Sequence, residues 1–254
     1  RVGSGSGPEV DVAVDPVDGT RLTAEGGPGA LAVLVVSERG TMYAPGKLVY
    51  MDKIAVGPEA AGTIALDAPV DYNLRQVAKA RGKDVNDLQA IILDRPRNQR
   101  YIDAVRSAGA RIRLIRDGDV SGAIAPAREE GNVDVLFGIG GSPEAVLAAG
   151  AMACLDGEIQ CRLWPRDETE REWAIENGLD LDQVMTTREL VDSNNVFFAA
   201  TGVTTGEFLD GVEYFGDGAT THSVVMRSKT GSIRSIIARH DFRKLRSISA
   251  VTLD

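Results

Sequence analysis

The chain has 254 residues, a mass of 27.0 kDa, a formal net charge of −9 at pH 7 and a sequence pI near 4.9. This acidity argues against a general nucleic-acid surface, because such a surface needs basic side chains to displace counterions from phosphates. Only two cysteines, Cys154 and Cys161, and two histidines are present, so the sequence supports neither a disulfide framework nor a zinc cluster. No apolar run reaches about 18 residues, and no signal peptide is recognisable before the first motif, so we expect a cytosolic protein without a membrane span.

The first predicted element is a strand over Val10–Val14, followed directly by the motif Asp-Pro-x-Asp-Gly-Thr at residues 15–20. Proline and glycine bend the chain there, so that Asp15, Asp18 and Thr20 can converge at the mouth of the strand. Hard oxygen ligands beside a hydroxyl suit a divalent cation and a polarised water, as a metal-dependent phosphatase requires. Taken alone, the motif could also be an ordinary turn.

Two further short apolar or alternating runs follow, over Leu31–Ser37 and Leu48–Ile54, and are bounded by glycine and proline. They are suited to the strands of a twisted antiparallel sheet that includes the first strand.

From residue 90 onward the predicted elements alternate in the order strand, helix, strand. Ala90–Leu93 leads into a helical stretch through Tyr101–Ala108, and strands are expected over Arg111–Ile115 and Val133–Phe137. This order predicts a parallel β/α unit. Ligands of such units bind beyond the carboxyl ends of the strands, and that is where the polar clusters at residues 95–97, 117–119 and 138–144 fall.

A largely apolar helix is expected after Pro143, and a charged, solvated helix over residues 167–177. The runs 221–227 and 232–238 flank a Lys-Thr-Gly turn and predict a hairpin that returns to the first sheet. The expected fold is therefore α/β, a layered sandwich of two parts. A mostly antiparallel sheet subdomain would take residues 1–87 and 195–254, and a parallel β/α sugar-phosphate subdomain would take residues 88–194.

As an ordered set, the motifs resemble those of the class II fructose-1,6-bisphosphatases, within the lithium-sensitive phosphatase superfamily. The matching segments are Asp15–Thr20, Val49–Ala55, Arg95–Arg97, Asp117–Asp119, Gly138–Glu144, Thr221–Lys229 and Gly231–Arg234. The resemblance implies a gluconeogenic enzyme that hydrolyses the 1-phosphate of fructose 1,6-bisphosphate with Mn²⁺ or Mg²⁺. It also implies a homo-oligomer, with sedoheptulose 1,7-bisphosphate as an alternative substrate.

The same resemblance assigns roles to the acidic residues. Asp15, Asp18 and Glu144 would be metal ligands, and Thr20, together with Asp18, would position the attacking water. A hydroxyl needs an acidic partner or a metal nearby for that task. Glu144 follows Pro143 at a helix start, so a plain capping role stays open for it.

Substrate contacts are implied for Asp18, Gly19, Thr20, Tyr50, Arg97, Asn98, Gln99, Asp117, Gly118, Asp119 and Gly141. Arg97 is the expected clamp on the phosphate that is not cleaved, since a guanidinium binds two phosphate oxygens at once. Asn98 stands where the family usually has histidine, and Arg95 could be structural. Asp117 and Asp119 would accept hydrogen bonds from sugar hydroxyls, or would simply be solvated. Tyr50 could instead be a half-buried strand residue.

Two alternatives complete the interpretation. Gly138-x-Gly140 could suggest a dinucleotide site, but Pro143 stands where the third glycine of that fingerprint would be. The family pattern also has acidic residues upstream of Arg1, so a non-catalytic sugar-phosphate-binding relative is the second hypothesis. On that view the sequence as it stands would bind a sugar bisphosphate weakly and turn it over poorly.

Overall fold

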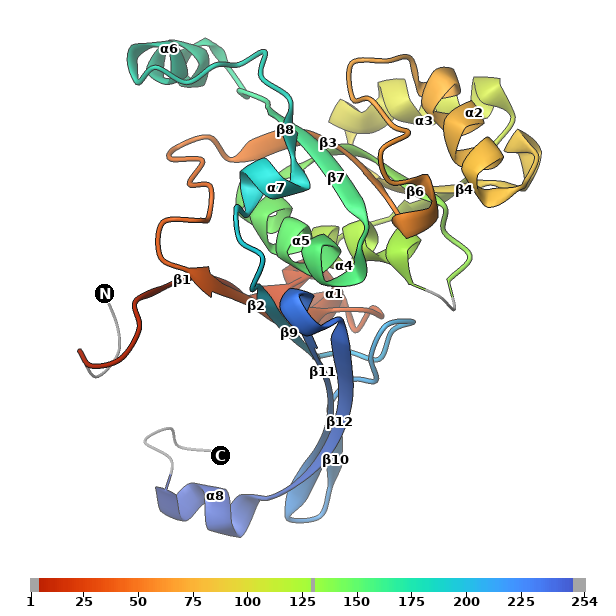
Figure 1. Cartoon of the computed structure of the whole chain (residues 1–254). Coiled ribbons are helices and arrows are strands. Elements are labelled where there is room, and N and C mark those ends of the chain that lie inside the picture. The colour runs from red at the N-terminus through yellow and green to blue at the C-terminus, as the bar shows by residue number, and fades with distance from the viewer. Residues whose placement is uncertain (1–4, 129–130, 249–254) are drawn as a thin grey trace.

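The computed structural model describes residues 5–128 and 131–248, which form two β-sheets and the helices packed on them (Figure 1). The strands of the first sheet are β1 (Val10–Asp18), β2 (Leu31–Glu38), β9 (Phe197–Gly202), β10 (Glu213–Phe215), β11 (Gly218–Arg227) and β12 (Ser232–Asp241). They run in the order β1-β2-β9-β11-β10, with β12 paired to β11, and all pairs are antiparallel. The expected first strand and late hairpin are thus confirmed, and the hairpin does return to the first sheet.

The second sheet is mixed and comes from the middle of the chain. Its strands are β3 (Tyr50–Val56), β4 (Gln89–Leu93), β5 (Arg111–Ile115), β6 (Val135–Gly141), β7 (Glu158–Leu163) and β8 (Met185–Thr186), in the order β5-β4-β6-β3-β7-β8. β4 pairs in parallel with β5 and β6, whereas β3 pairs antiparallel with β6 and β7. The predicted parallel β/α unit is present, and the α/β fold class is confirmed.

Helices separate and cover the sheets. They are α1 (Thr20–Glu25), α2 (Val70–Arg81), α3 (Gln99–Ala108), α4 (Asp119–Ile124), α5 (Ser142–Leu155), α6 (Glu168–Glu176), α7 (Thr187–Leu190) and α8 (Phe242–Ile248). Short 3-10 turns are η1 (Pro58–Ala60), η2 (Val85–Asp87), η3 (Pro96–Asn98), η4 (Ala125–Ala127) and η5 (Ser228–Thr230). α2 and α3 cover one face of the mixed sheet, and α4 and α5 lie between the two sheets (Figure 1).

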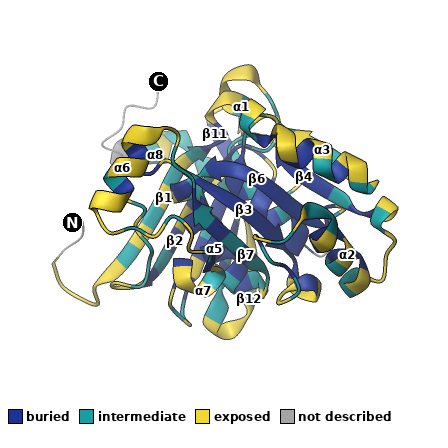
Figure 2. Cartoon of the chain, turned by 90° about the horizontal axis from the view of Figure 1, so that it is seen from above, coloured by how far each residue is buried: buried dark blue, intermediate teal, exposed yellow. Residues whose placement is uncertain are grey.

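The strand expected over Leu48–Ile54 joins the mixed sheet, not the antiparallel sheet with β1. It forms β3, in which every residue after Tyr50 is buried, because helices cover both faces of this sheet (Figure 2). α2 packs its Leu74 and Val77 on the same sheet. By sheet membership, residues 50–87 therefore go with the middle of the chain, whereas the predicted division placed them with β1.

The central layer of the molecule is α5. It is apolar all round because it contacts β2 and β9 on one side and β3 and β7 on the other. Gly150 lets the antiparallel sheet approach closely, since a Cβ there would lie 2.6 Å from the side chain of Val35. The charged helix expected over residues 167–177 is α6, which is largely exposed.

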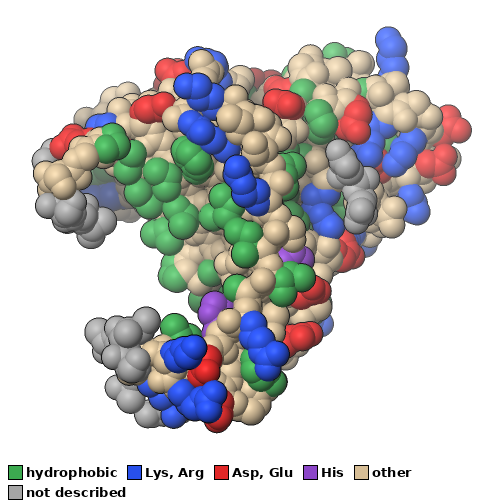
Figure 3. Space-filling view, turned by 60° about the horizontal axis from the view of Figure 1, so that its bottom comes forward, with side chains coloured by type: hydrophobic (Ala, Val, Ile, Leu, Met, Phe, Trp, Pro, Cys, Tyr) green, Lys and Arg blue, Asp and Glu red, His purple; other side chains and the backbone are tan. Residues whose placement is uncertain are grey.

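The outer face of the antiparallel sheet has no helix on it among the described residues. Val12 and Val14 of β1 are 52% and 64% exposed, and Leu34 and Phe197 lie on the same face of the neighbouring strands. Hydrophobic side chains gather on the face of the molecule seen from below (Figure 3). Further from the centre, the β11–β12 hairpin carries β10 and α8 away from the layered body (Figure 1). None of the helices in residues 5–128 and 131–248 is long and apolar enough to cross a bilayer.

Candidate active site

The end of β1 and the turn after it place Asp15, Asp18 and Thr20 at one end of both sheets. Pairing of β1 with β2 is irregular between Asp15 and Asp18, and the Asp15 Oδ1 accepts a hydrogen bond from the Val17 amide at 3.0 Å. Gly19 then adopts φ +89° and precedes α1, whose first residue is Thr20. This positive φ favours glycine, and the turn leaves the Thr20 side chain exposed.

Asp18 connects this segment to the mixed-sheet part of the molecule. Its side chain accepts hydrogen bonds from the backbone amides of Asp119 at 3.1 Å, Val120 at 3.1 Å and Ser121 at 3.4 Å, at the start of α4. Asp18 is only 4% exposed. Burial, followed by repulsion from Asp119, raises the pKa of its carboxyl to about 8. Asp18 therefore sits in a site with an excess of negative charge.

A buried ion pair forms the floor of the same region. Lys53 of β3 is 1% exposed, and its Nζ donates to a carboxylate oxygen of Asp119 and, at 2.7 Å, to the Gly141 carbonyl. Gly140 is required beside it, because a Cβ there would lie 2.1 Å from the Asp119 Oδ2. The sequence analysis did not single out Lys53. Its signal is an Asp-Lys pair, Asp52 and Lys53, inside a strand whose other residues after Tyr50 are apolar.

Glu144 lies in the first turn of α5, after Gly141 at the N-cap. A Cβ on Gly141 would be 1.9 Å from the Glu144 Oε2, so glycine is needed for this carboxylate to fold back. The Oε2 atom is buried and has no hydrogen-bond partner among the described residues. Burial is the main cause of the raised pKa of this carboxyl, and Lys53 opposes the shift. A buried carboxylate oxygen without a partner is unfavourable unless a cation compensates for it.

Arginines border the opposite side of the site. Arg97 lies in η3, its Nε donates to the Ile139 carbonyl at 3.0 Å, and its guanidinium carbon is 4.3 Å from the Tyr50 ring centre. Asp117 accepts from the Arg21 amide at 3.1 Å and lies 4.0 Å from the Arg95 guanidinium. These contacts hold Arg97 and Asp117 in place at the carboxyl ends of β4 and β5.

These groups surround one cavity of about 400 Å³. The lining residues are Asp15, Val17, Asp18, Gly19, Thr20, Val49, Tyr50, Leu93, Arg95, Arg97, Asp117, Asp119, Gly141, Pro143 and Glu144. The cavity thus brings together five carboxylates, two arginines and one threonine hydroxyl from both sheets. Such convergence of polar groups is typical of a small-molecule site that handles phosphate and metal.

Comparison with known proteins decides the family. Residues 1–240 match the model of the glpX-encoded bacterial fructose-1,6-bisphosphatases. The chain is 41% identical to fructose-1,6-bisphosphatase 1 class 2 of Escherichia coli K12, in an alignment of 254 residues that covers 94% of this chain and 75% of the relative. The class 2 fructose-1,6-bisphosphatases of E. coli O6:H1 (strain CFT073) and Shigella flexneri match with the same identity and coverage. The chain belongs to this family.

Membership of the class II fructose-1,6-bisphosphatases makes the protein a phosphatase that hydrolyses fructose 1,6-bisphosphate in gluconeogenesis. The resemblance inferred from the ordered motifs is confirmed. The family is metal-dependent, and carboxylate oxygens are the ligands that hard divalent cations prefer. In the part of the chain that the structure describes, however, no three acidic, His or Cys side chains are grouped closely enough to hold a metal ion.

Three residues predicted to contact substrate do not line the cavity. Asn98 is completely buried, where it donates to the Leu93 carbonyl at 3.0 Å and accepts from the Ile139 amide at 2.7 Å. Gln99 is exposed and donates to Asp103 at 2.8 Å. Gly118, with φ +87°, is the N-cap residue of α4 and is not among the lining residues. Asn98 is buried and does not line the cavity because it is the last residue of the 3-10 turn η3, which directs its side chain inward.

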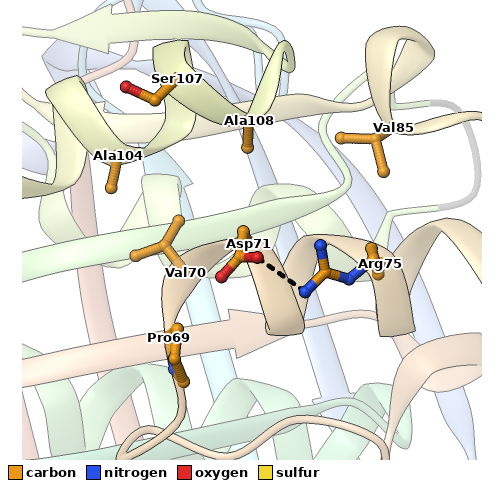
Figure 4. A pocket seen from close by; sticks show the side chains of 8 residues that line it. All are labelled: Pro69, Val70, Asp71, Arg75, Val85, Ala104, Ser107 and Ala108. Carbon is orange, nitrogen blue, oxygen red and sulfur yellow. Dashed lines mark ion pairs between the residues drawn. The ribbon is translucent and has the colours of Figure 1, made fainter.

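A larger depression of about 650 Å³ lies elsewhere, between α2 and α3 (Figure 4). Its only ion pair among the residues drawn joins Asp71 and Arg75 of α2, with 2.6 Å between nitrogen and oxygen. Much of the remaining lining is apolar and comes from Val70, Val85 and Ala108. Among its lining residues the only charged pair is satisfied within α2, and Ser107 is the one hydroxyl. The depression lacks the excess of carboxylates found in the cavity between the sheets, so size alone does not identify the active site of this phosphatase.

Proposed function

We propose that the 1-phosphate of fructose 1,6-bisphosphate is hydrolysed in the cavity of about 400 Å³ between the two sheets. The observation that carries the proposal is the excess of carboxylates over arginines in its lining, together with the buried, unpaired Oε2 of Glu144. A phosphate dianion would be repelled by such a lining unless cations were bound there too.

Asp15, Asp18 and Glu144 would hold a divalent cation, Mg²⁺ or Mn²⁺. Their side chains must turn toward one another to do so, since no group of three already converges within the described ranges. When bound, the cation supplies charge stabilisation at the reacting phosphate. The raised pKa of the Asp18 carboxyl, about 8, is the signature of a carboxylate that gains from a nearby positive charge.

Thr20 would orient the attacking water. It is the first residue of α1, it is exposed, and it lies two residues after Asp18, which is fixed by three backbone hydrogen bonds from α4. The Asp18 contacts therefore hold the Gly19–Thr20 segment against the mixed sheet. A Thr20 side chain held in this way would keep the attacking water in one orientation, which lowers the entropic part of the barrier.

The sugar bisphosphate would extend from Thr20 toward Arg97. The Arg97 guanidinium, stacked on Tyr50, would bind the phosphate that is not cleaved, and Arg95 lines the same end. Asp117 would accept hydrogen bonds from sugar hydroxyls. Asp119 is already paired with Lys53, so its role would be to support the Gly140–Gly141 turn. The homo-oligomeric state and the cytosolic location remain predictions.

The proposal is tested with the purified protein and fructose 1,6-bisphosphate, by measuring phosphate release before and after removal of metal with EDTA. Release should stop in EDTA and return when Mn²⁺ or Mg²⁺ is added in excess. Glu144→Gln should need a higher cation concentration for half-maximal rate, whereas the exposed control Glu172→Gln should not. Unchanged turnover in EDTA, or an unchanged cation requirement in Glu144→Gln, would contradict the proposed site.

A further inference from the structure

A second cavity, of about 520 Å³, lies on the other side of Asp117. It runs along β5, which is an edge strand of the mixed sheet, and is closed by α1 and by residues 205–208 from the antiparallel part. Asp117 and no other residue belongs to the lining of both this cavity and the proposed catalytic cavity. The second cavity is thus a separate space that shares one wall with the first.

The floor of this second cavity is apolar. Ile91, Ile115, Leu22 and Ala125 line it, and Gly122 keeps it open, since a Cβ there would lie 2.9 Å from the Ile115 Cδ1. Leu114 at its edge is exposed. Cavities that combine an apolar floor with a few charged groups at the rim are the usual form of small-molecule sites.

The rim carries positive charge, although the chain as a whole has a net charge of −9. Arg113, Arg116 and Arg128 all line the cavity. Glu207 contacts two of them in different ways: its side-chain Oε2 lies 2.6 Å from the Arg113 Nη1, and its backbone carbonyl accepts a hydrogen bond from Arg128 at 2.5 Å. The Glu207 side chain is mostly exposed, so an anion already occupies this position and can be exchanged for another.

We propose that this cavity, beyond the activity proposed above, is a second binding site for a small phosphate monoester or phosphonate with an apolar body. The anionic group displaces the Glu207 carboxylate from Arg113, and the apolar body rests on Ile91, Ile115 and Leu22. The Arg113 guanidinium, which now binds the Glu207 carboxylate, can donate two parallel hydrogen bonds to a phosphate or phosphonate.

Leu22 connects this site to the catalytic turn. Its Cδ1 lies 3.1 Å from the position of a Cβ on Gly19 and 3.6 Å from that of a Cβ on Gly118. It therefore packs against the residue that precedes Thr20 and the residue that follows Asp117. A ligand on Leu22 contacts the element that carries Thr20, and we expect it to change kcat without competing with the substrate.

The test is isothermal titration of the purified protein with phenylphosphonate, which carries a dianion and an apolar ring and is not a phosphatase substrate. Methylphosphonate, which lacks the ring, should bind more weakly. Arg113→Gln should weaken phenylphosphonate binding about tenfold or more, since a charge-assisted contact is lost. Glu207→Gln should strengthen binding about two- to fivefold, because the competing carboxylate is removed.

Two further variants distinguish the sites. Arg97→Ala, in the proposed catalytic cavity, and Arg171→Gln, on exposed α6, should leave phenylphosphonate binding unchanged. Binding that is lost in Arg97→Ala and retained in Arg113→Gln would overturn the proposal, because the ligand would then occupy the catalytic cavity. Absence of any binding, or unchanged binding in Glu207→Gln, would overturn it too. None of these outcomes bears on metal-dependent phosphate release, which is measured separately.

Discussion

In the mixed sheet every residue of β3 after Tyr50 is buried, whereas in the antiparallel sheet every second residue of β1, from Val10 to Pro16, is exposed. The first pattern follows from helices on both faces, and the second from α5 on one face only. The two sheets meet at α5 and at the proposed catalytic cavity. They contribute different kinds of residue to it.

The mixed-sheet part supplies groups that are already hydrogen-bonded, such as the buried Lys53 and Asp119 and the half-buried Arg97. The antiparallel sheet supplies Asp15 and Thr20, which retain contact with solvent at the end of β1. We infer that the mixed-sheet side of the cavity is a rigid binding surface for the substrate. The antiparallel side carries the groups proposed to act on the reacting phosphate. Substitutions on the first side should therefore affect stability and substrate affinity, and those on the second side should affect turnover.

The largest effect is expected at the buried ion pair. Lys53→Met removes the partner of Asp119 and leaves a buried carboxylate uncompensated, which should lower the free energy of unfolding by about 3–5 kcal/mol. Urea denaturation measures it, with Lys79→Met on the exposed side of α2 as the control. If Lys53→Met lowered the unfolding free energy no more than Lys79→Met, the mixed-sheet side of the cavity would not depend on the Lys53–Asp119 pair.

Arg97→Ala should raise KM for fructose 1,6-bisphosphate by a factor corresponding to about 1.5–3 kcal/mol, since it removes a charge-assisted contact to the distal phosphate. Fructose 1-phosphate, which lacks that phosphate, should be affected far less. Steady-state kinetics with both substrates makes the comparison, and Arg171→Ala serves as the control. Equal damage with the two substrates would place Arg97 at the reacting phosphate or in the fold instead.

Asp18 is the exception on the antiparallel side, because it is buried and hydrogen-bonded, and it should therefore affect the pH dependence of stability. The Asp18 carboxyl has a pKa of about 8 in the folded protein, against an ordinary value of 3.8. Between these values the folded state holds a proton that the unfolded state has lost. Without divalent cations, the free energy of unfolding should therefore fall as pH rises through this interval, with a slope from Asp18 of up to about 1.4 kcal/mol per pH unit.

Asp18→Asn tests that slope, because it removes the titrating group and should flatten the dependence over the same interval. Urea unfolding at several pH values in EDTA supplies the data, with Asp11→Asn, elsewhere on β1, as the control. A slope that persists in Asp18→Asn would assign the titration to another carboxyl.

The smallest effect is expected on the outer face of the antiparallel sheet. Val14→Thr, at a residue 64% exposed, should change the free energy of unfolding by less than about 0.5 kcal/mol. Val35→Thr on the inner face, where the side chain is 0% exposed, should cost about 1–3 kcal/mol because it buries a hydroxyl. Similar costs at both positions would mean that the outer face is covered in solution.

Much of this architecture could be predicted from the sequence. The β/α unit follows from the periodicity between residues 90 and 137, and the late hairpin from its turn at Lys229–Gly231. Strand β3 was assigned to the antiparallel sheet because a short apolar run does not reveal which sheet it joins. Motif order identified most of the cavity, including Asp15, Thr20 and Glu144.

Other features of the site depend on contacts that spacing does not encode. The Lys53–Asp119 pair joins residues 66 positions apart, so nothing local indicates it. Arg95, whose role the sequence left open, lines the cavity, whereas Asn98, which was expected to contact substrate, is buried by the turn of η3. The bridge from Asp18 to the amides of α4 likewise appears only when both segments are folded.

The most direct test of the central claim, that the end of β1 carries the reactive groups, is kcat of Thr20→Ala on fructose 1,6-bisphosphate, measured beside the urea stability of the same preparation. We predict a kcat at least about 100-fold lower with little change in KM and an unfolding free energy within about 0.5 kcal/mol of the unmodified protein, while Thr230→Ala retains normal kcat. A near-normal kcat in Thr20→Ala would contradict the account.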